Sequence, residues 1–202
     1  MIRSTRRPTR RRRRHTGAKI GLALFTVALL AVAVWYVALF PKQAEKTVYP
    51  LAYEEMIASS AREFGLDPAR VAAVIYCESS FRVSAVSSAG AVGLMQIMPS
   101  TRAWIAEKLN IENYSEESLY DPATNIRLGC WYLNYLNDRF GGDLTKVTAA
   151  YHAGGGKVDE WLKDERYSSD GETLAELPDN ATGAYVQAVA RAYDIYKEKM
   201  DT

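Results

Sequence analysis

The chain has 202 residues and a formal net charge of +1 at pH 7, which averages over three unlike parts. Residues 1–19 hold nine basic side chains and no acid, residues 20–40 hold no charge, and residues 41–202 combine the remaining 16 basic side chains with all 24 acids. The acidic balance of the last part argues against a nucleic-acid-binding domain. The two histidines lie far apart with no cysteine cluster near either, which argues against a zinc site.

The uncharged run at residues 20–40 predicts a single transmembrane helix. At about 1.5 Å per residue, this length suffices for a hydrocarbon core of roughly 30 Å. The basic tail at 1–19 should stay cytoplasmic, so the remainder of the chain is expected outside the cell membrane. A cleaved signal peptide is the close alternative, but its apolar region usually has 7 to 15 residues, and the small residues at 31–33 fall inside the run. Residues 41–50 are interpreted as a linker.

Residues 51–202 amount to one domain, in which nearly every segment has helical periodicity. The first expected helix covers about 51–64, with three apolar side chains facing inward: Met56, Ile57 and Phe64. The second opens with Asp67 as N-cap and Pro68 as first helical residue. Residues 81–99 lack this periodicity and are rich in small and hydroxyl residues, which predicts a long, compact loop.

The remaining elements are also expected to be helical. A third helix should start at Ser100 or Thr101, and Asp121-Pro122 should open a fourth whose apolar side chains run from Ile126 to Phe140. A fifth should follow Asp143, with Leu144, Val147 and Tyr151 on one face, and end in the glycine run at 154–156. A polar, exposed loop is expected at 164–179 and a last helix at 182–199. The class is therefore all-α, without internal repeats.

Glu78 is an acid at a position where the helical pattern predicts an apolar side chain. Its spacing to Val71, Val74 and Ile75 is that of one buried helical face. Burial raises the pKa of a carboxyl group above about 4.3, and a carboxyl that keeps its proton near pH 7 is a usable general acid. The alternative is that the helix already ends at Ser79, which would leave Glu78 at a solvated terminus.

Residues 78–101, which run ESSFRVSAVSSAGAVGLMQIMPST, closely resemble the signature of the lytic transglycosylase catalytic domain. That lysozyme-like family cleaves the glycan strands of bacterial peptidoglycan. Further blocks follow in the family's order: Asn125-Ile126, Gly129, Tyr132-Leu133, Ala150 to Gly154, and Tyr185-Val186. The resemblance covers about 51–198 and implies a lysozyme-like helical domain.

The resemblance also implies a mechanism with one carboxyl group. Glu78 would first protonate the glycosidic oxygen, the substrate's N-acetyl group would assist, and the same Glu78 would then activate the C6 hydroxyl to give a 1,6-anhydromuramoyl end. The substrate-binding residues that the resemblance implies are Ser87, Met95, Gln96, Met98, Tyr151 and Tyr185. Taken alone, Met95 has the pattern of an ordinary core residue, Gln96 of a solvated loop residue and Tyr151 of a half-buried helical residue.

Two departures from the family pattern and one cysteine pair leave questions open. His152 stands where the family usually has Asn, which replaces an amide by a group that titrates near pH 6.5 and could alter the pH profile. Ala181 stands where the family often has Glu, so a second acid near the last helix is not expected. An extracytoplasmic location would permit a disulfide between Cys77 and Cys130, but buried free cysteines are an equal alternative.

Together these features lead us to expect a membrane-anchored peptidoglycan lytic transglycosylase that needs no cofactor. The N-terminus would be cytoplasmic and the catalytic domain extracytoplasmic, with a possible place in a cell-wall synthesis, division or sporulation complex. A hydrolytic muramidase and a non-catalytic peptidoglycan-binding scaffold protein are the two alternatives.

Overall fold

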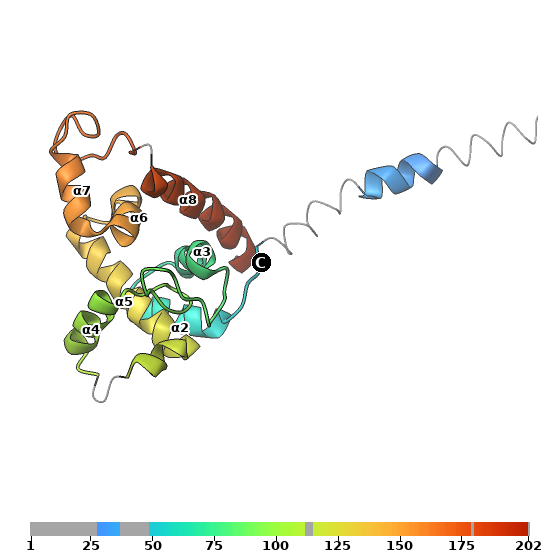
Figure 1. Ribbon diagram of the computed structural model, residues 1–202. Helices are drawn as coiled ribbons and strands as arrows, with labels where there is room; N and C mark the ends of the chain where they lie inside the picture. Colours follow the sequence, from blue (N-terminus) through green and yellow to red (C-terminus); the bar gives the residue numbers. More distant parts are fainter. Residues whose placement is uncertain (1–27, 37–48, 112–114, 179, 202) are drawn as a thin grey trace, which may run out of the picture. The chain divides into compact units, whose positions relative to one another are not determined.

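The computed structural model describes residues 28–36, 49–111, 115–178 and 180–201 (Figure 1). The chain divides into two compact units, Met1–Val48 and Tyr49–Thr202.

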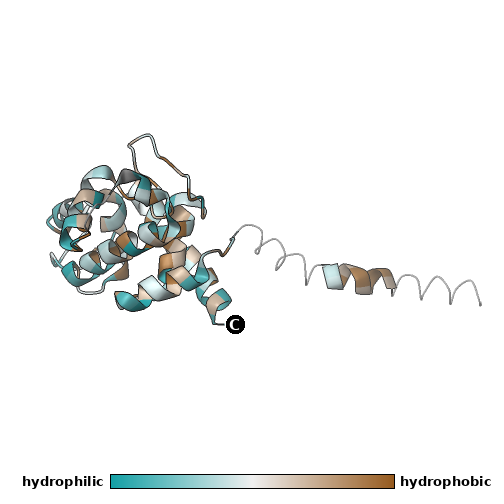
Figure 2. Cartoon of the chain, turned by 90° about the horizontal axis from the view of Figure 1, so that it is seen from below, coloured by the Kyte–Doolittle hydropathy of each residue, from teal (hydrophilic) through white to brown (hydrophobic). Residues whose placement is uncertain are grey.

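In the first unit, residues 28–36 form a helix that is apolar along most of its length (Figure 2). Within the described part of the chain, no helix is both long and apolar enough to cross a bilayer. The other positions of the expected anchor, residues 20–27 and 37–40, lie outside the described residues, as does the basic tail. The membrane anchor therefore stays a prediction.

The second unit is helical, as expected, and its described residues form no strand beyond isolated bridges between residues of the 81–98 loop. Its elements are α2 (Glu54–Glu63), α3 (Pro68–Ser79), α4 (Pro99–Lys108), η1 (Glu116–Tyr120), α5 (Pro122–Arg139), α6 (Leu144–Ala153), α7 (Gly155–Leu162) and α8 (Ala181–Met200). Helix α3 lies in the middle of this unit and packs mainly along α8, with α2 also against it (Figure 1).

The predicted helix starts are confirmed by their caps. The carboxylates of Asp67, Asp121 and Asp143 each accept a hydrogen bond from a backbone N–H in the first turn of the following helix. Asn180 caps α8 in the same way. The predicted apolar face of α5 is also confirmed, because its side chains from Ile126 to Phe140 belong to the main core. Burial of such faces is the main source of stability in a fold of this size.

Some boundary and orientation predictions were wrong. Met56 is 39% exposed although it was expected inward, and Leu144 is 53% exposed although it was placed on one face with Val147, which is fully buried. The helix after Asp143 ends in the glycine run as predicted, but α7 was not predicted: Gly154 adopts a φ of +86° and α7 begins directly after it. Glycine accepts a positive φ without steric cost, so the chain can turn sharply there and resume a helix. The 3₁₀ helix η1 was not predicted.

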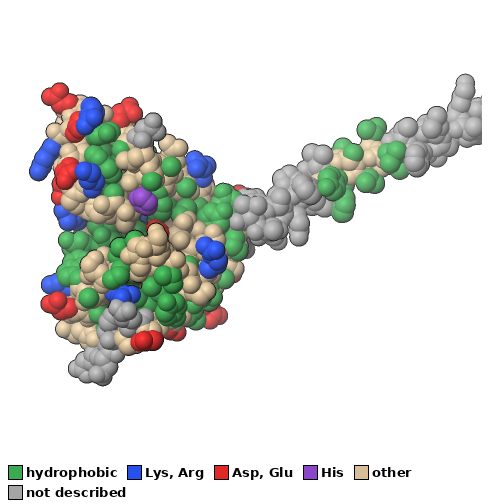
Figure 3. All heavy atoms as spheres, in the orientation of Figure 1, with side chains coloured by type: hydrophobic (Ala, Val, Ile, Leu, Met, Phe, Trp, Pro, Cys, Tyr) green, Lys and Arg blue, Asp and Glu red, His purple; other side chains and the backbone are tan. Residues whose placement is uncertain are grey.

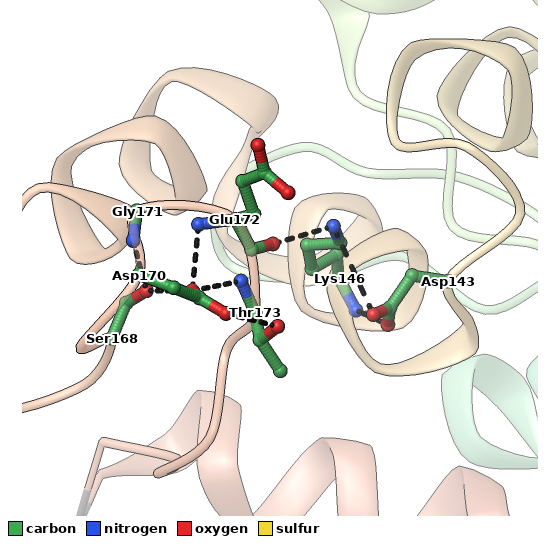
Figure 4. A network of polar contacts seen from close by, with 7 residues as sticks. All are labelled: Asp143, Lys146, Ser168, Asp170, Gly171, Glu172 and Thr173. Carbon is green, nitrogen blue, oxygen red and sulfur yellow. Dashed lines mark hydrogen bonds and ion pairs between the residues drawn. The ribbon is translucent and has the colours of Figure 1, made fainter.

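The polar loop between α7 and α8 is ordered by one aspartate. Asp170 accepts hydrogen bonds from the backbone N–H groups of Glu172 (2.8 Å) and Thr173 (2.7 Å), as Figure 4 shows. The ammonium group of Lys146, from α6, donates to the Glu172 carbonyl at 2.7 Å and lies 3.8 Å from Asp143. The loop predicted at 164–179 is therefore hydrogen-bonded to the start of α6 through Lys146.

Candidate active site

Glu78 lies in the last turn of α3, and its side chain is half-buried. The helix ends at Ser79, as the alternative interpretation required, and Ser80 closes it with a positive φ of 50°. The helix end is nevertheless covered, because the buried Ser79 hydroxyl donates to the Leu94 carbonyl of the following loop at 2.8 Å. The carboxyl of Glu78 is thus at a helix terminus but not in bulk solvent.

The surroundings of Glu78 favour its protonated form. Burial raises the pKa of Glu78 to about 7, even though the hydrogen bond from Tyr185 acts in the opposite direction. The Tyr185 hydroxyl, on α8, donates this bond to Oε1 of Glu78 at 2.6 Å. A carboxyl group with a pKa near 7 can both give and take a proton at neutral pH.

The raised pKa predicts a pH-dependent cost in stability. The ionised form of Glu78 is disfavoured in the fold, so the contribution of Glu78 to stability should be greatest below pH 4.5 and should be lost as the pH rises to about 7. At the end of this window the loss is about 3 kcal/mol. Glu78→Gln removes the titrating group, so the stability of the variant relative to that of the wild type should increase as the pH rises from 4.5 to about 7. Urea unfolding of both proteins at pH 4.5, 6 and 8 measures the difference between their free energies of unfolding. The same difference at all three pH values would contradict the raised pKa.

A buried amide fixes the loop that follows α3. Asn125, fully buried on α5, accepts a hydrogen bond from the Met95 N–H at 2.8 Å. Its amide nitrogen donates to the carbonyls of Val92 and Leu119, at 3.0 Å each. Gly93 has a φ of +84°, and a Cβ added there would lie 2.0 Å from the Asn125 nitrogen. The loop therefore approaches α5 so closely that only glycine fits at this point.

Gln96 is held in place by the same loop rather than solvated. Its amide nitrogen donates to the carbonyls of Ala85 (3.1 Å) and Gly93 (2.9 Å). The residue has a positive φ of 48°, a conformation that non-glycine side chains seldom adopt. Strained backbone of this kind is often found at functional sites.

Two hollows meet at Gln96. The first, with a volume of about 440 Å³, is lined by Glu78, Arg82, Ser84, Ala85, Val86, Ser87 and Gln96. The second, of about 210 Å³, is lined by Gln96, Ile97, Met98, Thr101, Tyr132, Tyr151, His152, Ala153 and Gly154. Because Gln96 borders both, the two hollows are neighbours, and we call them together the groove; it runs from the carboxyl of Glu78 past Gln96 to the end of α6. On the face seen in Figure 3, most charged side chains lie toward the edges and the centre is mostly hydrophobic or uncharged.

The structure brings most of the predicted site residues to this groove. Ser87, Gln96, Met98 and Tyr151 line it with Glu78. Met98 is 39% exposed, as an apolar surface for a sugar requires.

The prediction that Met95 binds the substrate was wrong, because its side chain is fully buried and cannot contact a saccharide. It packs instead against α5, where a Cβ added to Gly129 would lie 2.2 Å from its sulfur. The core interpretation of Met95 is the one that the structure supports.

The two predicted tyrosines have different roles. Tyr185 holds the carboxyl of Glu78, whereas the Tyr151 hydroxyl donates to the backbone carbonyl of Met95 at 2.8 Å. Burial, and then the nearby charge of Glu78, raise the pKa of Tyr151 well above its ordinary value. Tyr151 therefore supports the loop beneath the groove, and Tyr185 is the residue that orients the acid.

Tyr185→Phe should move the basic side of the activity profile to higher pH. The lost hydrogen bond favours the ionised carboxylate, so without it the pKa of Glu78 rises further and the acid stays protonated over a wider range. We expect the midpoint of the fall in kcat/KM to increase by about one pH unit. Tyr193→Phe, on the same helix but bonded to Asp67, is the matched control and should leave that midpoint unchanged.

Four residues that build the site were not predicted to belong to it: Arg82, Asn125, Tyr132 and His152. Asn125 and Tyr132 were noted only within the family resemblance, and His152 only as a departure from it. Arg82, Tyr132 and His152 line the groove, and Asn125 anchors its floor. The available signal for Asn125 was an amide beside Ile126 on an otherwise apolar face. Arg82 gave no signal, since it is an exposed loop residue in an irregular stretch.

Cys77 and Cys130 are free cysteines in the structure, which has no disulfide between them. Burial raises the pKa of the Cys77 thiol to about 11, and it raises that of Cys130 further. Both sulfurs are therefore uncharged thiols at neutral pH.

Another hollow, of about 370 Å³, lies between the N-terminal end of α3, the start of α6 and α8. Its lining mixes apolar side chains with Arg70, Asp67 and Asp194, and it contains none of the predicted site residues. The chemistry of Glu78 therefore belongs to the groove at Gln96 and not to this hollow.

Comparison with known proteins places these features in context. The family model described as "Transglycosylase SLT domain" matches residues 55–173. The soluble lytic murein transglycosylase of Escherichia coli (strain K12) is 35% identical over 150 residues, which is 73% of this chain and 23% of that protein. The membrane-bound lytic murein transglycosylase C of Actinobacillus pleuropneumoniae serotype 5b is 30% identical over 174 residues, covering 79% and 47%.

Solved structures agree with this result. The 70 kDa soluble lytic transglycosylase of Escherichia coli superposes with a TM-score of 0.71 at 30% identity, over 82% of this chain and 27% of that one. An inactive mutant of the lytic transglycosylase Slt from Pseudomonas aeruginosa gives 0.69 at 36% identity, over 76% and 25%. The chain thus spans about a quarter of the length of the first relatives that it matches.

Proposed function

Because the chain belongs to the transglycosylase SLT domain family, whose fold is all-α and lysozyme-like, we propose that it is a lytic transglycosylase that cleaves the glycan strands of peptidoglycan. The single observation that carries the proposal is the half-buried carboxyl of Glu78, with a pKa near 7, at one end of a groove.

In the first step the protonated Glu78 gives its proton to the oxygen of the bond between N-acetylmuramic acid and N-acetylglucosamine. The bond from that oxygen to the anomeric carbon breaks, and the carbonyl oxygen of the substrate's N-acetyl group bonds to the anomeric carbon. Tyr185 keeps its hydrogen bond to the resulting carboxylate, which stabilises the ionised form during this interval.

In the second step the carboxylate of Glu78 takes the proton of the C6 hydroxyl. The C6 oxygen then bonds to the anomeric carbon and displaces the N-acetyl oxygen. The product is a 1,6-anhydromuramoyl end, no water is consumed, and Glu78 is again protonated. One group with a pKa near the working pH can serve both steps.

The lining of the groove supports this reaction over hydrolysis. Among its described residues, Glu78 is the single carboxyl group. Enzymes that hydrolyse glycosides normally place two carboxyl groups on either side of the scissile bond, about 5 to 9.5 Å apart. A reaction in which the substrate supplies both the N-acetyl group and the C6 hydroxyl needs only one.

We also propose that residues 20–40 anchor the domain to the cell membrane, with residues 1–19 cytoplasmic. The support is the charge-free run behind a tail of nine basic side chains. One relative is itself named as membrane-bound. Washing membranes that hold the full chain with carbonate tests this, since a spanning helix stays in the membrane fraction and a cleaved chain does not.

Mass spectrometry of purified peptidoglycan digested by the detergent-solubilised full chain tests the proposed activity. We expect released fragments with anhydro ends, which are lighter by one water than hydrolysed ends. Hydrolysed ends would favour the muramidase alternative. Binding to peptidoglycan without released fragments would favour a scaffold protein.

A further inference from the structure

His152 differs from the residue that the resembling family has at this position and lies next to the residue that holds the catalytic acid. It is in the last turn of α6, where its partly exposed ring lines the second hollow of the groove. Its ring centroid is 4.7 Å from that of Tyr185, with 31° between the ring planes. The Tyr185 hydroxyl in turn donates to Glu78. A titratable imidazole is therefore linked to the acid through a single tyrosine.

The imidazole of His152 has a second contact, with Thr182. Nδ1 of His152 lies 3.0 Å from the hydroxyl of Thr182, which is buried at the start of α8. Thr182 and Tyr185 thus fix the ring from the same helix. This arrangement keeps His152 beside Tyr185 and does not leave it free to swing out of the groove.

Few of the groups around His152 change charge near neutral pH. The neighbours that face it are Tyr132 from α5, Tyr151 from its own helix, Thr182 and Tyr185 from α8, and Glu78 from α3 behind Tyr185. The pKa values of all three tyrosines are raised by burial, so these phenols stay neutral. Of this set, Glu78 has a pKa raised to about 7 and His152 a pKa lowered from 6.5, so these are the two groups whose charge changes on the acidic side of neutral pH or close to it.

We propose that His152 is a positioning residue that supports turnover only as the neutral imidazole, and that its protonation switches the site off at acidic pH. The inference rests on the proposed function. Neutral His152 packs against Tyr185 and so keeps the hydroxyl on Glu78. Partial burial of the ring lowers its pKa from 6.5, which keeps the neutral form dominant at pH 7.

Protonation of His152 opposes the reaction in two ways. The glycosidic bond breaks through a transition state in which the sugar carries positive charge, and an imidazolium in the same groove repels that charge. The imidazolium also favours the ionised form of Glu78, which cannot act as the acid. Both effects lower kcat/KM as the pH falls. Ionisation of Glu78 lowers it as the pH rises through about 7, so the wild-type profile should be bell-shaped.

The test is the pH profile of kcat/KM between pH 4.5 and 8.5 for the detergent-solubilised full chain and its His152→Asn variant. Asparagine is the residue that the resembling family carries at this position, so the variant is expected to fold. The wild type should lose at least about tenfold in kcat/KM on the acidic side. The variant should lack this acidic fall and keep the basic one. A variant with the wild-type acidic fall would overturn the proposal.

A second measurement does not depend on activity. The chain has only two histidines, so the NMR titration of His152 can be assigned with a His15→Gln variant. Its midpoint should coincide with that of the acidic fall in kcat/KM, because the same protonation causes both. A His152 midpoint that lies clearly apart from the acidic fall would overturn the proposal. If the wild type releases no fragments at any pH, the proposed function fails, and the titration still shows at which pH the imidazole becomes charged.

Discussion

Glu78→Gln is expected to lower the rate of glycan cleavage by about 10³-fold or more. Glutamine keeps the shape of the side chain, and its oxygen can accept the hydrogen bond from the Tyr185 hydroxyl, so the groove is preserved. The amide has no proton to give to the glycosidic oxygen and cannot take one from the C6 hydroxyl. Both steps of the proposed reaction are therefore lost by one substitution.

The release of anhydro fragments, measured by liquid chromatography and mass spectrometry, gives this rate. Glu107→Gln, at an exposed position on α4, is the matched control and should cleave at the wild-type rate. The Glu78→Gln protein should still be folded and should resist urea better than the wild type at pH 8. Cleavage by Glu78→Gln within tenfold of the wild type would show that another group supplies the proton.

Asn125→Ala should destabilise the domain by at least about 2 kcal/mol. Asn125 is fully buried and makes three hydrogen bonds, with the Met95 N–H and with the carbonyls of Val92 and Leu119. The Val92 carbonyl also accepts a bond from the Ile97 N–H and keeps that partner, but alanine takes away the side-chain partner of the other two groups, and each unpaired group costs about 1 to 3 kcal/mol. The floor of the groove loses its attachment to α5 at the same time, so cleavage should fall as well.

Urea unfolding at pH 6 measures the change in free energy. Asn134→Ala, at a half-buried position further along α5, is the control and should cost less than half as much. Asn125→Asp should be nearly as damaging as alanine, since a carboxylate cannot donate to the two carbonyls. A loss of less than about 1 kcal/mol for Asn125→Ala would show that water or a loop shift replaces the amide.

Features that depend on neighbouring residues could be predicted from the sequence. The aspartate before Pro68 marks a helix start because cap and proline act within one turn. The apolar side chains of α5 could be placed inside because their spacing matches the helical period. The long loop after α3 was expected for the same local reason, a loss of periodicity.

Features that depend on distant residues could not be predicted in the same way. Tyr185 and Glu78 are 107 positions apart, and Asn125 is 30 positions from Met95, so no local pattern connects them. The family resemblance named Tyr185 as a site residue but not its partner. It also named Met95, which the fold buries because α5 offers Gly129 as a space for its sulfur. The break between α6 and α7 depended on the positive φ of Gly154, which composition does not reveal.

The protonation of Glu78 near neutral pH is the claim on which the proposed reaction depends, and a direct titration of its carboxyl group measures it. Selective ¹³C labelling of glutamate, with Glu78→Gln to identify the signal, follows the carboxyl carbon by NMR from pH 3 to pH 9. We expect a midpoint at a pKa of about 7. A midpoint near 4.3, the value of a solvated glutamate, would contradict the account.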